Sequence, residues 1–234
     1  MPRESKASKV ARVTEFCHRL HALYGQAPSA LVWETPFQLV ICVLLSAQTT
    51  DAAVNAVTVE LFDRWPDAAS MSEADIEEVA EVIHRLGFFR TKSAHCVQTA
   101  QKIMADFGGE VPTTMDELTS LPGVGRKTAN IVLNKAFGIV EGIAVDTHVF
   151  RIAQRMGLTS AKTPLAAEQD LLRTIPKELW DNVNSEWIRF GRATCTARSA
   201  KCDECVANDI CPRRPVRHGA GKQTKAKRPK STKD

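Results

Sequence analysis

The sequence predicts an all-α protein, and three observations lead to this fold class. Apolar residues recur at helical spacing along nearly all of the 234 residues. No segment shows the alternation of apolar and polar residues that is typical of a half-buried strand. Residues that start or stop helices recur at short intervals. We therefore expect helices joined by short loops, with no internal repeat.

Most of the expected helices have a start signal in the sequence. Pro36 suits the first turn of a helix that continues as FQLVICVLLSA, which is apolar enough to be mostly buried. Asp51 and Asp146 are placed to cap two further helices. Ser72 and Asp75 together resemble a capping box. The expected helices cover residues 36–47, 51–65, 73–86, 91–107, 114–121, 126–137, 146–156, 165–174 and 184–193.

The composition excludes several classes of protein. The longest apolar run, Leu39 to Leu45, is far shorter than the roughly 18 residues that span a bilayer. The N-terminal segment MPRESKASKVAR is charged, so we expect no secretory signal. Seven cysteines are an odd number, which argues against a disulfide framework. We expect an intracellular protein, cytoplasmic and nucleoid-associated if bacterial, and exclude an extracellular, fibrous or integral-membrane one.

The positive net charge belongs to the C-terminal segment. Residues 213–234 hold nine Lys or Arg against Asp234 alone, so residues 1–212 carry a formal −4 although the whole chain carries +4. A basic segment of this kind indicates a polyanion partner, or is simply a solvated end. We expect residues 1–8 and 214–234 to be disordered.

Four cysteines stand in one short segment with the spacing C-x6-C-x2-C-x5-C: Cys195, Cys202, Cys205 and Cys211. Thiolates this close together need a cation, which an iron–sulfur cluster or zinc would supply. A single CxxC flanked by lone cysteines favours one [4Fe–4S] cluster; zinc, which more often pairs two CxxC turns, and a site without metal are the alternatives. The three other cysteines lie on apolar helix faces, where we expect small buried side chains: Cys17, Cys42 and Cys96.

The segment TTMDELTSLPGVGRKTANIVLNKAFG predicts two helices joined by a tight turn. Gly123 and Gly125 have no Cβ, so they permit tight backbone angles and let a ligand approach the main chain. The following helix presents free amides and the positive end of its dipole at this turn, which makes a phosphate site. The basic pair Arg126 and Lys127 favours phosphate contact over a plain helix connector.

Lys127 has an unusual position for a structural lysine. A helix N-terminus disfavours a cation, and burial would disfavour it further. An amine made neutral in this way is a nucleophile that can form a Schiff base; the alternative is a solvated lysine that touches phosphate. Asp146 is an expected N-cap, and its fixed carboxylate can also stabilise an oxocarbenium-like sugar cation or accept a proton.

These motifs, in this order, resemble a known family. LLSAQTTD, LPGVGRKTAN, AVDTH and the four-cysteine segment are similar to those of endonuclease III, a family of helix–hairpin–helix DNA glycosylases with an iron–sulfur cluster. The resemblance covers residues 15–212 and implies two helical domains on either side of a DNA-binding cleft. The implied parts are a six-helix barrel with the hairpin at 29–140, a cluster domain made of 1–28 and 141–213, and a basic tail at 214–234.

The resemblance implies a bifunctional enzyme of base excision repair, which removes oxidised pyrimidines from duplex DNA and then nicks the strand. Lys127 would attack C1′ of the extruded nucleotide, and the resulting Schiff base would permit β-elimination at the 3′ phosphate. Asp146 matches the catalytic aspartate of the family. The four cysteines match its [4Fe–4S] ligands, and the cluster there is structural or DNA-sensing. The expected partner is damaged double-stranded DNA, bound by a monomer without a membrane.

The resemblance also implies which residues contact DNA. Gln48 matches the glutamine that fills the gap left by the extruded base. Phe88 lies where the family inserts a leucine wedge, and the alternative is a core phenylalanine. His148 and Arg151 are expected to contact the DNA backbone. The hairpin residues expected to bind DNA are Gly123, Val124, Gly125 and Arg126.

Two other functions compete with this interpretation. An adenine-mismatch glycosylase of the same superfamily shares the hairpin and the cysteines, but it lacks the lysine nucleophile and has a glutamate in an early helix, where this chain has Ala47 and Gln48. A non-catalytic DNA-binding module would need only the hairpin and the basic tail. Lys127 and Asp146 together argue against that module.

Overall fold

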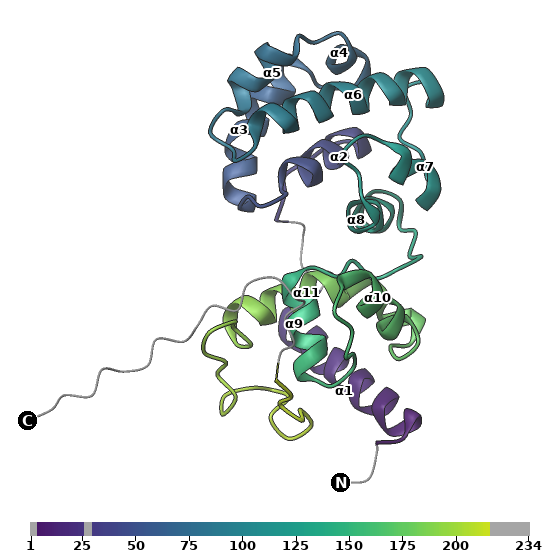
Figure 1. Ribbon diagram of the computed structural model, residues 1–234, viewed down its shortest axis with the longest axis vertical. Coiled ribbons are helices and arrows are strands. Elements are labelled where there is room, and N and C mark those ends of the chain that lie inside the picture. The colour runs from purple at the N-terminus through teal and green to yellow at the C-terminus, as the bar shows by residue number, and fades with distance from the viewer. Residues whose placement is uncertain (1–3, 26–29, 216–234) are drawn as a thin grey trace, which may run out of the picture.

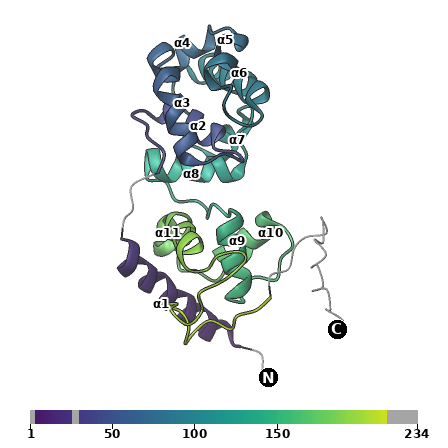
Figure 2. The same ribbon diagram turned by 90° about the vertical axis from the view of Figure 1, so that its left-hand side faces the viewer.

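The computed structural model describes residues 4–25 and 30–215, and over these residues it contains helices and no strand. The helices form two lobes, one above the other in Figure 1. The hairpin lobe contains α2 to α8, and the cysteine lobe contains α1, α9 to α11 and the loop after α11 (Figures 1 and 2). The predicted all-α fold is confirmed.

The hairpin lobe is a ring of helices around a shared apolar centre, with α8 on the side that faces the cysteine lobe (Figure 2). The six helices expected in this part of the chain are present, together with a short α4 that the sequence did not predict. Their bounds are α2 Pro36–Leu45, α3 Asp51–Arg64, α4 Ala68–Ser72, α5 Ile76–Ile83, α6 Phe89–Phe107, α7 Met115–Ser120 and α8 Arg126–Phe137.

Helix α2 is the most deeply buried helix of this lobe. Thr35 caps it by accepting a hydrogen bond from the Gln38 amide, and Pro36 occupies the first turn as predicted. Every residue from Phe37 to Leu45 is buried. Even so, none of the described helices combines the length and hydropathy that a bilayer span requires.

Two of the predicted helix caps are wrong. Thr50, not Asp51, is the N-cap of α3, because its side chain accepts a hydrogen bond from the Ala53 amide. Ser72 is not a cap either, since it is the last residue of α4, which a capping box at Asp67 starts one turn earlier. Asp75 alone caps α5, as the acceptor of the Glu77 amide.

The cysteine lobe packs α1 and α9 against α11. Its core includes three aromatic rings in edge-to-face contact, with the centroid of Phe16 lying 5.1 Å from that of Trp187 and 5.4 Å from that of Phe190. The bounds are α1 Lys6–Tyr24, α9 Thr147–Arg155, α10 Pro164–Leu172, a 3₁₀ turn Lys177–Leu179 and α11 Trp180–Ala193.

The disorder predicted at the two ends is wrong for the residues that the structure describes. Helix α1 begins at Lys6 because Ser5 caps it, and Glu4 forms an ion pair with Arg12 at 2.8 Å. At the other end, the Arg214 amide donates to the Arg155 carbonyl at 2.9 Å. Residues 1–3 and 216–234 lie outside the described residues.

The buried apolar side chains form two separate clusters, one in each lobe. The predicted domain boundary at residues 140/141 stays a prediction. Cys42 and Cys96 lie in the first cluster and Cys17 in the second, so the expected burial of these three thiols is confirmed. Burial raises the pKa of each to about 12, which keeps all three protonated and inert at neutral pH.

Candidate functional site

The tight turn between α7 and α8 depends on Gly123. Its φ of +74° is left-handed, and a Cβ there would lie 2.6 Å from Nδ1 of His95 on α6. Gly125 has φ −91°, and a Cβ at that position would meet no atom within 4 Å, so it needs no special backbone angle. Val124 is buried between them, and its amide donates to the Leu121 carbonyl. The turn is therefore rigid at Gly123 and open at Gly125.

The N-terminus of α8 is open to an anion. Its N-cap is Gly125, and no side chain caps the helix. The amides of the first turn, together with the positive end of the helix dipole, are thus directed at whatever approaches the turn. This arrangement agrees with the predicted phosphate site.

Lys127 is the second residue of α8, and its side chain is exposed. The expectation that burial would disfavour its ammonium form is wrong for the described chain, because no lobe covers this side chain. The helix dipole remains. Any further exclusion of water has to come from a bound ligand.

Arg126 is held by the other lobe. Its Nε lies 2.9 Å from Oε2 of Glu168 on α10, and its Nη2 lies 3.2 Å from Oε1. Nδ2 of Asn130 also donates to that carboxylate, at 3.1 Å, and Glu168 is only 4% exposed. The guanidinium therefore joins α8 to α10, and its predicted DNA contact stays a prediction.

Asp146 is the N-cap of α9, as predicted. One carboxylate oxygen, Oδ1, accepts hydrogen bonds from the amides of His148 and Val149, both at 2.8 Å. The residue is half-buried and follows the buried segment 143–145. Two amides thus fix the orientation of the carboxylate, which is the requirement for an electrostatic or proton-accepting role.

His148 and Arg151 are directed at α11 and the start of the segment that follows it, within the cysteine lobe. Nη2 of Arg151 lies 3.1 Å from Nδ1 of His148, and the same guanidinium donates to the carbonyls of Gly191 and Cys195. A guanidinium can only donate, so Nδ1 of His148 is the acceptor. Burial lowers the pKa of His148, which favours this neutral imidazole. The DNA contacts predicted for both residues stay predictions.

Gln48 and Phe88 share an unusual backbone conformation. Both are exposed, and both have left-handed φ values, 54° for Gln48 and 60° for Phe88. Phe88 is 66% exposed, which excludes the alternative of a core phenylalanine. Residues other than glycine adopt this conformation rarely, and they do so mostly at functional sites. The sequence contained no local signal for it.

The four clustered cysteines line one cavity of about 170 Å³ in the cysteine lobe, with apolar walls that include Ile152 and Phe190. Burial raises the pKa of Cys205 and Cys211, and the neighbouring thiols raise it further. Deprotonating these thiols together would therefore need a compensating cation.

Several N–H groups are directed at the sulfur atoms. Nη1 of Arg155 lies 3.1 Å from Sγ of Cys195, and the backbone amide of Arg213 lies 3.4 Å from Sγ of Cys211. Such donors are typical of iron–sulfur sites. Four thiols around one cavity are a donor set that fits a [4Fe–4S] cluster, although no three His, Cys, Asp or Glu side chains of the described residues close around a single ion position.

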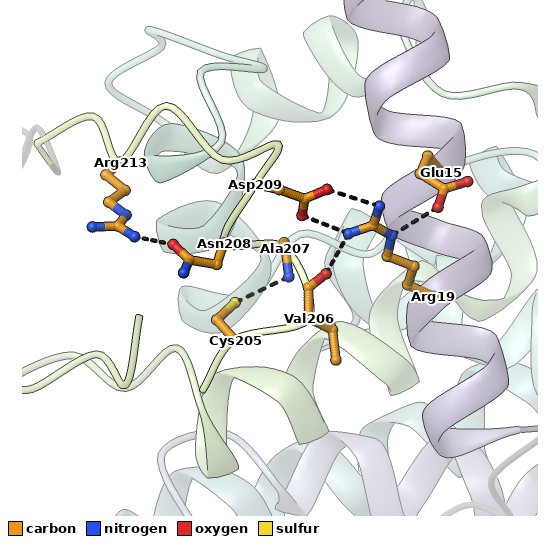
Figure 3. A network of polar contacts seen from close by, with 8 residues as sticks. All are labelled: Glu15, Arg19, Cys205, Val206, Ala207, Asn208, Asp209 and Arg213. Carbon is orange, nitrogen blue, oxygen red and sulfur yellow. Dashed lines mark hydrogen bonds and ion pairs between the residues drawn. The ribbon is translucent and has the colours of Figure 1, made fainter. Parts of the chain in front are cut away.

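Arg19 of α1 clamps the cysteine loop from outside (Figure 3). Its guanidinium donates to the Val206 carbonyl at 2.6 Å and to both carboxylate oxygens of Asp209, at 2.6 and 3.0 Å. Glu15, one turn earlier, accepts a further hydrogen bond at 2.7 Å. This clamp holds the segment that carries Cys205 and its hydrogen bond from the Ala207 amide.

Sequence reasoning missed Arg19, Arg155 and Glu168. For Arg155 a signal existed, because Arg151 and Arg155 are four residues apart and must lie on one face of α9. Glu168 gave no such signal, and the pair of Arg19 with Glu15 did not indicate the distant Val206 and Asp209.

Comparisons with known proteins agree with this arrangement. Residues 41–177 match the family described as HhH-GPD superfamily base excision DNA repair protein. Endonuclease III of Synechocystis sp. is 48% identical over 206 residues, covering 88% of this chain and 94% of that protein. Endonuclease III of Escherichia coli K12 is 38% identical over 201 residues, covering 86% and 95%.

Solved structures give the same result. A trapped endonuclease III–DNA covalent intermediate aligns with a TM-score of 0.82 at 37% identity, covering 90% of this chain and 97% of that one. A non-covalent endonuclease III–DNA complex aligns with the same TM-score at 36% identity, with the same coverage.

The fold and the hairpin therefore define a helix–hairpin–helix protein of the HhH-GPD superfamily of base excision DNA repair proteins. Within that superfamily the chain belongs to the endonuclease III family. It is accordingly a DNA N-glycosylase with AP lyase activity.

Proposed function

We propose that this enzyme removes oxidised pyrimidines from damaged double-stranded DNA, with Lys127 as the nucleophile and Asp146 as its catalytic partner. The observation that carries the proposal is the exposed amine of Lys127 at the uncapped N-terminus of α8, directly behind the hairpin turn. A nucleophile must be reachable by the sugar of an extruded nucleotide, and a merely structural lysine would not need this position.

The proposed reaction begins with extrusion of the damaged nucleotide, because C1′ cannot be reached inside the base stack. Gln48 and Phe88 project from the hairpin lobe and would occupy the space that the nucleotide leaves. The backbone amides at the start of α8 would hold a phosphate of the same strand.

In the chemical step, the neutral amine of Lys127 attacks C1′, and the base leaves with the electron pair of the glycosidic bond and takes up a proton. The carboxylate of Asp146 stabilises the positive charge that develops on the sugar. The attached nitrogen then loses one proton, and the C1′–O4′ bond breaks while O4′ takes up a proton, which leaves a protonated Schiff base on Lys127. The Schiff base acidifies the C2′ hydrogen. Removal of this hydrogen as a proton expels the 3′ phosphate by β-elimination.

We also propose that Cys195, Cys202, Cys205 and Cys211 hold a [4Fe–4S] cluster. The four thiols share one cavity, and N–H donors surround their sulfur atoms. When bound, the cluster would supply the positive charge that binds four thiolates and would cross-link a segment that has no helix of its own. We propose further that the enzyme acts as a monomer within the cell.

The test of the nucleophile is borohydride trapping on a duplex that contains one thymine glycol. We expect Lys127→Gln to reduce trapping to background while its affinity for an abasic-site analogue stays close to that of the wild type, because the helix dipole and the hairpin remain. The control is Lys162→Gln, which removes an exposed lysine of the cysteine lobe and should trap normally. Normal trapping by Lys127→Gln would mean that another amine is the nucleophile.

A panel of duplexes separates the proposed function from its competitor. Each duplex contains one defect: thymine glycol, dihydrouracil, an abasic site, or adenine opposite 8-oxoguanine. We expect base release from the first two, nicking of the third and no release from the fourth. Release of adenine alone would assign the chain to the adenine-mismatch branch.

A further inference from the structure

Lys92 on α6 is the one lysine that is buried among the residues the structure describes, with 4% of its surface exposed. Lysine is seldom buried unless its ammonium has a partner and a purpose. Here Nζ donates a hydrogen bond to Oγ1 of Thr49 at 2.7 Å. Neither residue takes part in the proposed chemistry.

The Thr49 hydroxyl connects Lys92 to the turn that carries Gln48. A hydroxyl can accept one hydrogen bond and donate another. Oγ1 of Thr49 accepts from Lys92 and lies 3.2 Å from the carbonyl oxygen of Ala47, to which it donates. The two residues on either side of Gln48 are thus linked to each other and to α6.

This link bears on the backbone conformation of Gln48. A φ of 54° is unfavourable for a residue that has a Cβ, so the surrounding structure must hold it there. The other hydrogen bonds of the turn are local: the amides of Ala47 and Thr49 donate to the carbonyls of Leu44 and Ser46, at 3.4 and 3.1 Å, and the Gln48 side chain is exposed. The ammonium of Lys92 supplies the contact that comes from a different helix.

The same lysine also contacts the second projecting residue. The backbone amide of Lys92 donates to the carbonyl of Phe88 at 3.0 Å, in the first turn of α6. Phe88 has the other left-handed φ at this edge of the lobe, 60°. Lys92 is therefore bonded through its main chain to Phe88 and through its side chain to the residue next to Gln48.

We propose that Lys92 is a positioning residue that, through Thr49, fixes the separation between Gln48 and Phe88 so that both can enter the duplex together. The proposal rests on the proposed function, in which these two residues replace the extruded nucleotide. The buried ammonium of Lys92 and the hydroxyl of Thr49 keep the two exposed residues at a fixed distance from each other. The neighbouring thiol of Cys96 is protonated and adds no competing charge.

The sharpest test uses Thr49, because Thr49→Val removes the hydroxyl and keeps the shape of the side chain. Base release from a thymine glycol duplex is measured in single turnover, and 2-aminopurine opposite the lesion reports by its fluorescence whether the gap is filled. We expect release to slow by about tenfold, as loss of a charge-assisted hydrogen bond implies, and the fluorescence change to shrink. Thr49→Ser, which retains the hydroxyl, should restore both signals.

A second substrate distinguishes this proposal from the proposed function. Borohydride trapping on a preformed abasic site needs Lys127 but no extrusion of a base, so Thr49→Val should trap within about twofold of wild type there. Absence of abasic trapping in the wild type would overturn the proposed function itself. Two results for Thr49→Val would overturn the role of Lys92. One is an equal loss of base release on thymine glycol and of trapping on the abasic site, and the other is normal base release.

Lys92→Met tests the cation directly, with Lys102→Met on the same helix as its control. Lys102 is a surface residue in an ion pair with Asp106, and its loss should leave the fluorescence change intact. We expect Lys92→Met to reproduce the Thr49→Val pattern. If Lys92→Met does not fold, the pair Thr49→Val and Thr49→Ser still decides the question.

Discussion

The two lobes of this enzyme differ in the contacts that stabilise each of them internally. In the hairpin lobe, helices surround α2, whose residues from Phe37 to Leu45 are all buried, so apolar packing fixes their positions. In the cysteine lobe, the helices share an aromatic core, but the segment after α11 contains no helix as far as residue 215, where the described part of the chain ends. Arginine side chains hold that segment through directional hydrogen bonds to its carbonyl and carboxylate oxygens.

This difference matters because each lobe contributes one group to the proposed reaction. Lys127 belongs to α8 of the hairpin lobe and Asp146 to α9 of the cysteine lobe. Their relative position depends on contacts between the lobes, such as the ion pair between the half-exposed Arg126 and the buried Glu168. Apolar packing therefore positions both α8 and α9, whereas arginine contacts and the proposed cluster hold the segment after α11.

The largest effect that this comparison predicts comes from Cys202→Ser. Loss of one proposed cluster ligand should abolish the visible absorption of the protein and strongly lower amide protection over residues 195–213, because this segment has no helix and only Ala207 of it is a buried member of the apolar core. Protection in α2 and α6 should stay within a few-fold of wild type. Hydrogen exchange followed by mass spectrometry measures both.

Cys42→Ser is the matched control, since this thiol lies in the other lobe. It should keep the visible absorption. A colourless wild-type protein with stoichiometric zinc would contradict the cluster assignment. Equal loss of protection in both lobes of Cys202→Ser would contradict the independence of the two lobes.

A smaller effect, located in the hairpin lobe instead of the cysteine lobe, is expected from Leu61→Ala. Leu61 is fully buried in the hairpin lobe, and truncation of such a side chain costs about 2–5 kcal/mol of unfolding free energy. Urea denaturation monitors the loss. Iron content should not change, because Leu61 is absent from the core of the cysteine lobe. Iron loss in this variant at native conditions would show that the lobes unfold together.

The smallest effect concerns pH. Glu186 is buried in α11 and hydrogen-bonded to His21 of α1 at 2.8 Å, and burial raises its pKa above the ordinary 4.5. A raised carboxyl pKa means that the folded state binds the proton more tightly, so this group stabilises the fold less as the pH rises through that window. Glu186→Gln should remove that dependence.

The measurement is the unfolding free energy of wild type and Glu186→Gln at a series of pH values. The difference should favour the variant increasingly as the pH rises above about 4.5. Glu178→Gln, which changes a surface acid of the same lobe, should follow the wild-type curve. A constant difference between Glu186→Gln and the wild type would mean that the folded and unfolded pKa values are equal.

Much of the fold could be predicted because its signals are local. A few neighbouring residues are enough to predict a helix start at Pro36, a tight turn at Gly123 and an N-cap at Asp146. Helix α4 was missed because the better capping box, at Asp67, contains a serine at its fourth position where the common pattern has an acid or amide.

The contacts between distant residues could not be predicted in this way. More than 40 positions separate the two members of each such pair: Lys92 and Thr49, Arg126 and Glu168, and Arg19 and Asp209. No periodicity or cap relates one member of such a pair to the other. The exposure of Lys127 was misjudged for the same reason, since burial depends on which surfaces meet.

The contact between Gly123 and His95 has a mechanical consequence. Because any Cβ at position 123 would collide with the imidazole, the turn lies directly against α6. His95 is about two helical turns beyond Phe88 on that helix. The proposed phosphate site and the exposed ring of Phe88 are therefore connected rigidly through α6. If both parts contact DNA as proposed, a shift of the strand at the turn would be transmitted to the ring of Phe88, so backbone distortion and weakened stacking would be sampled in a single movement.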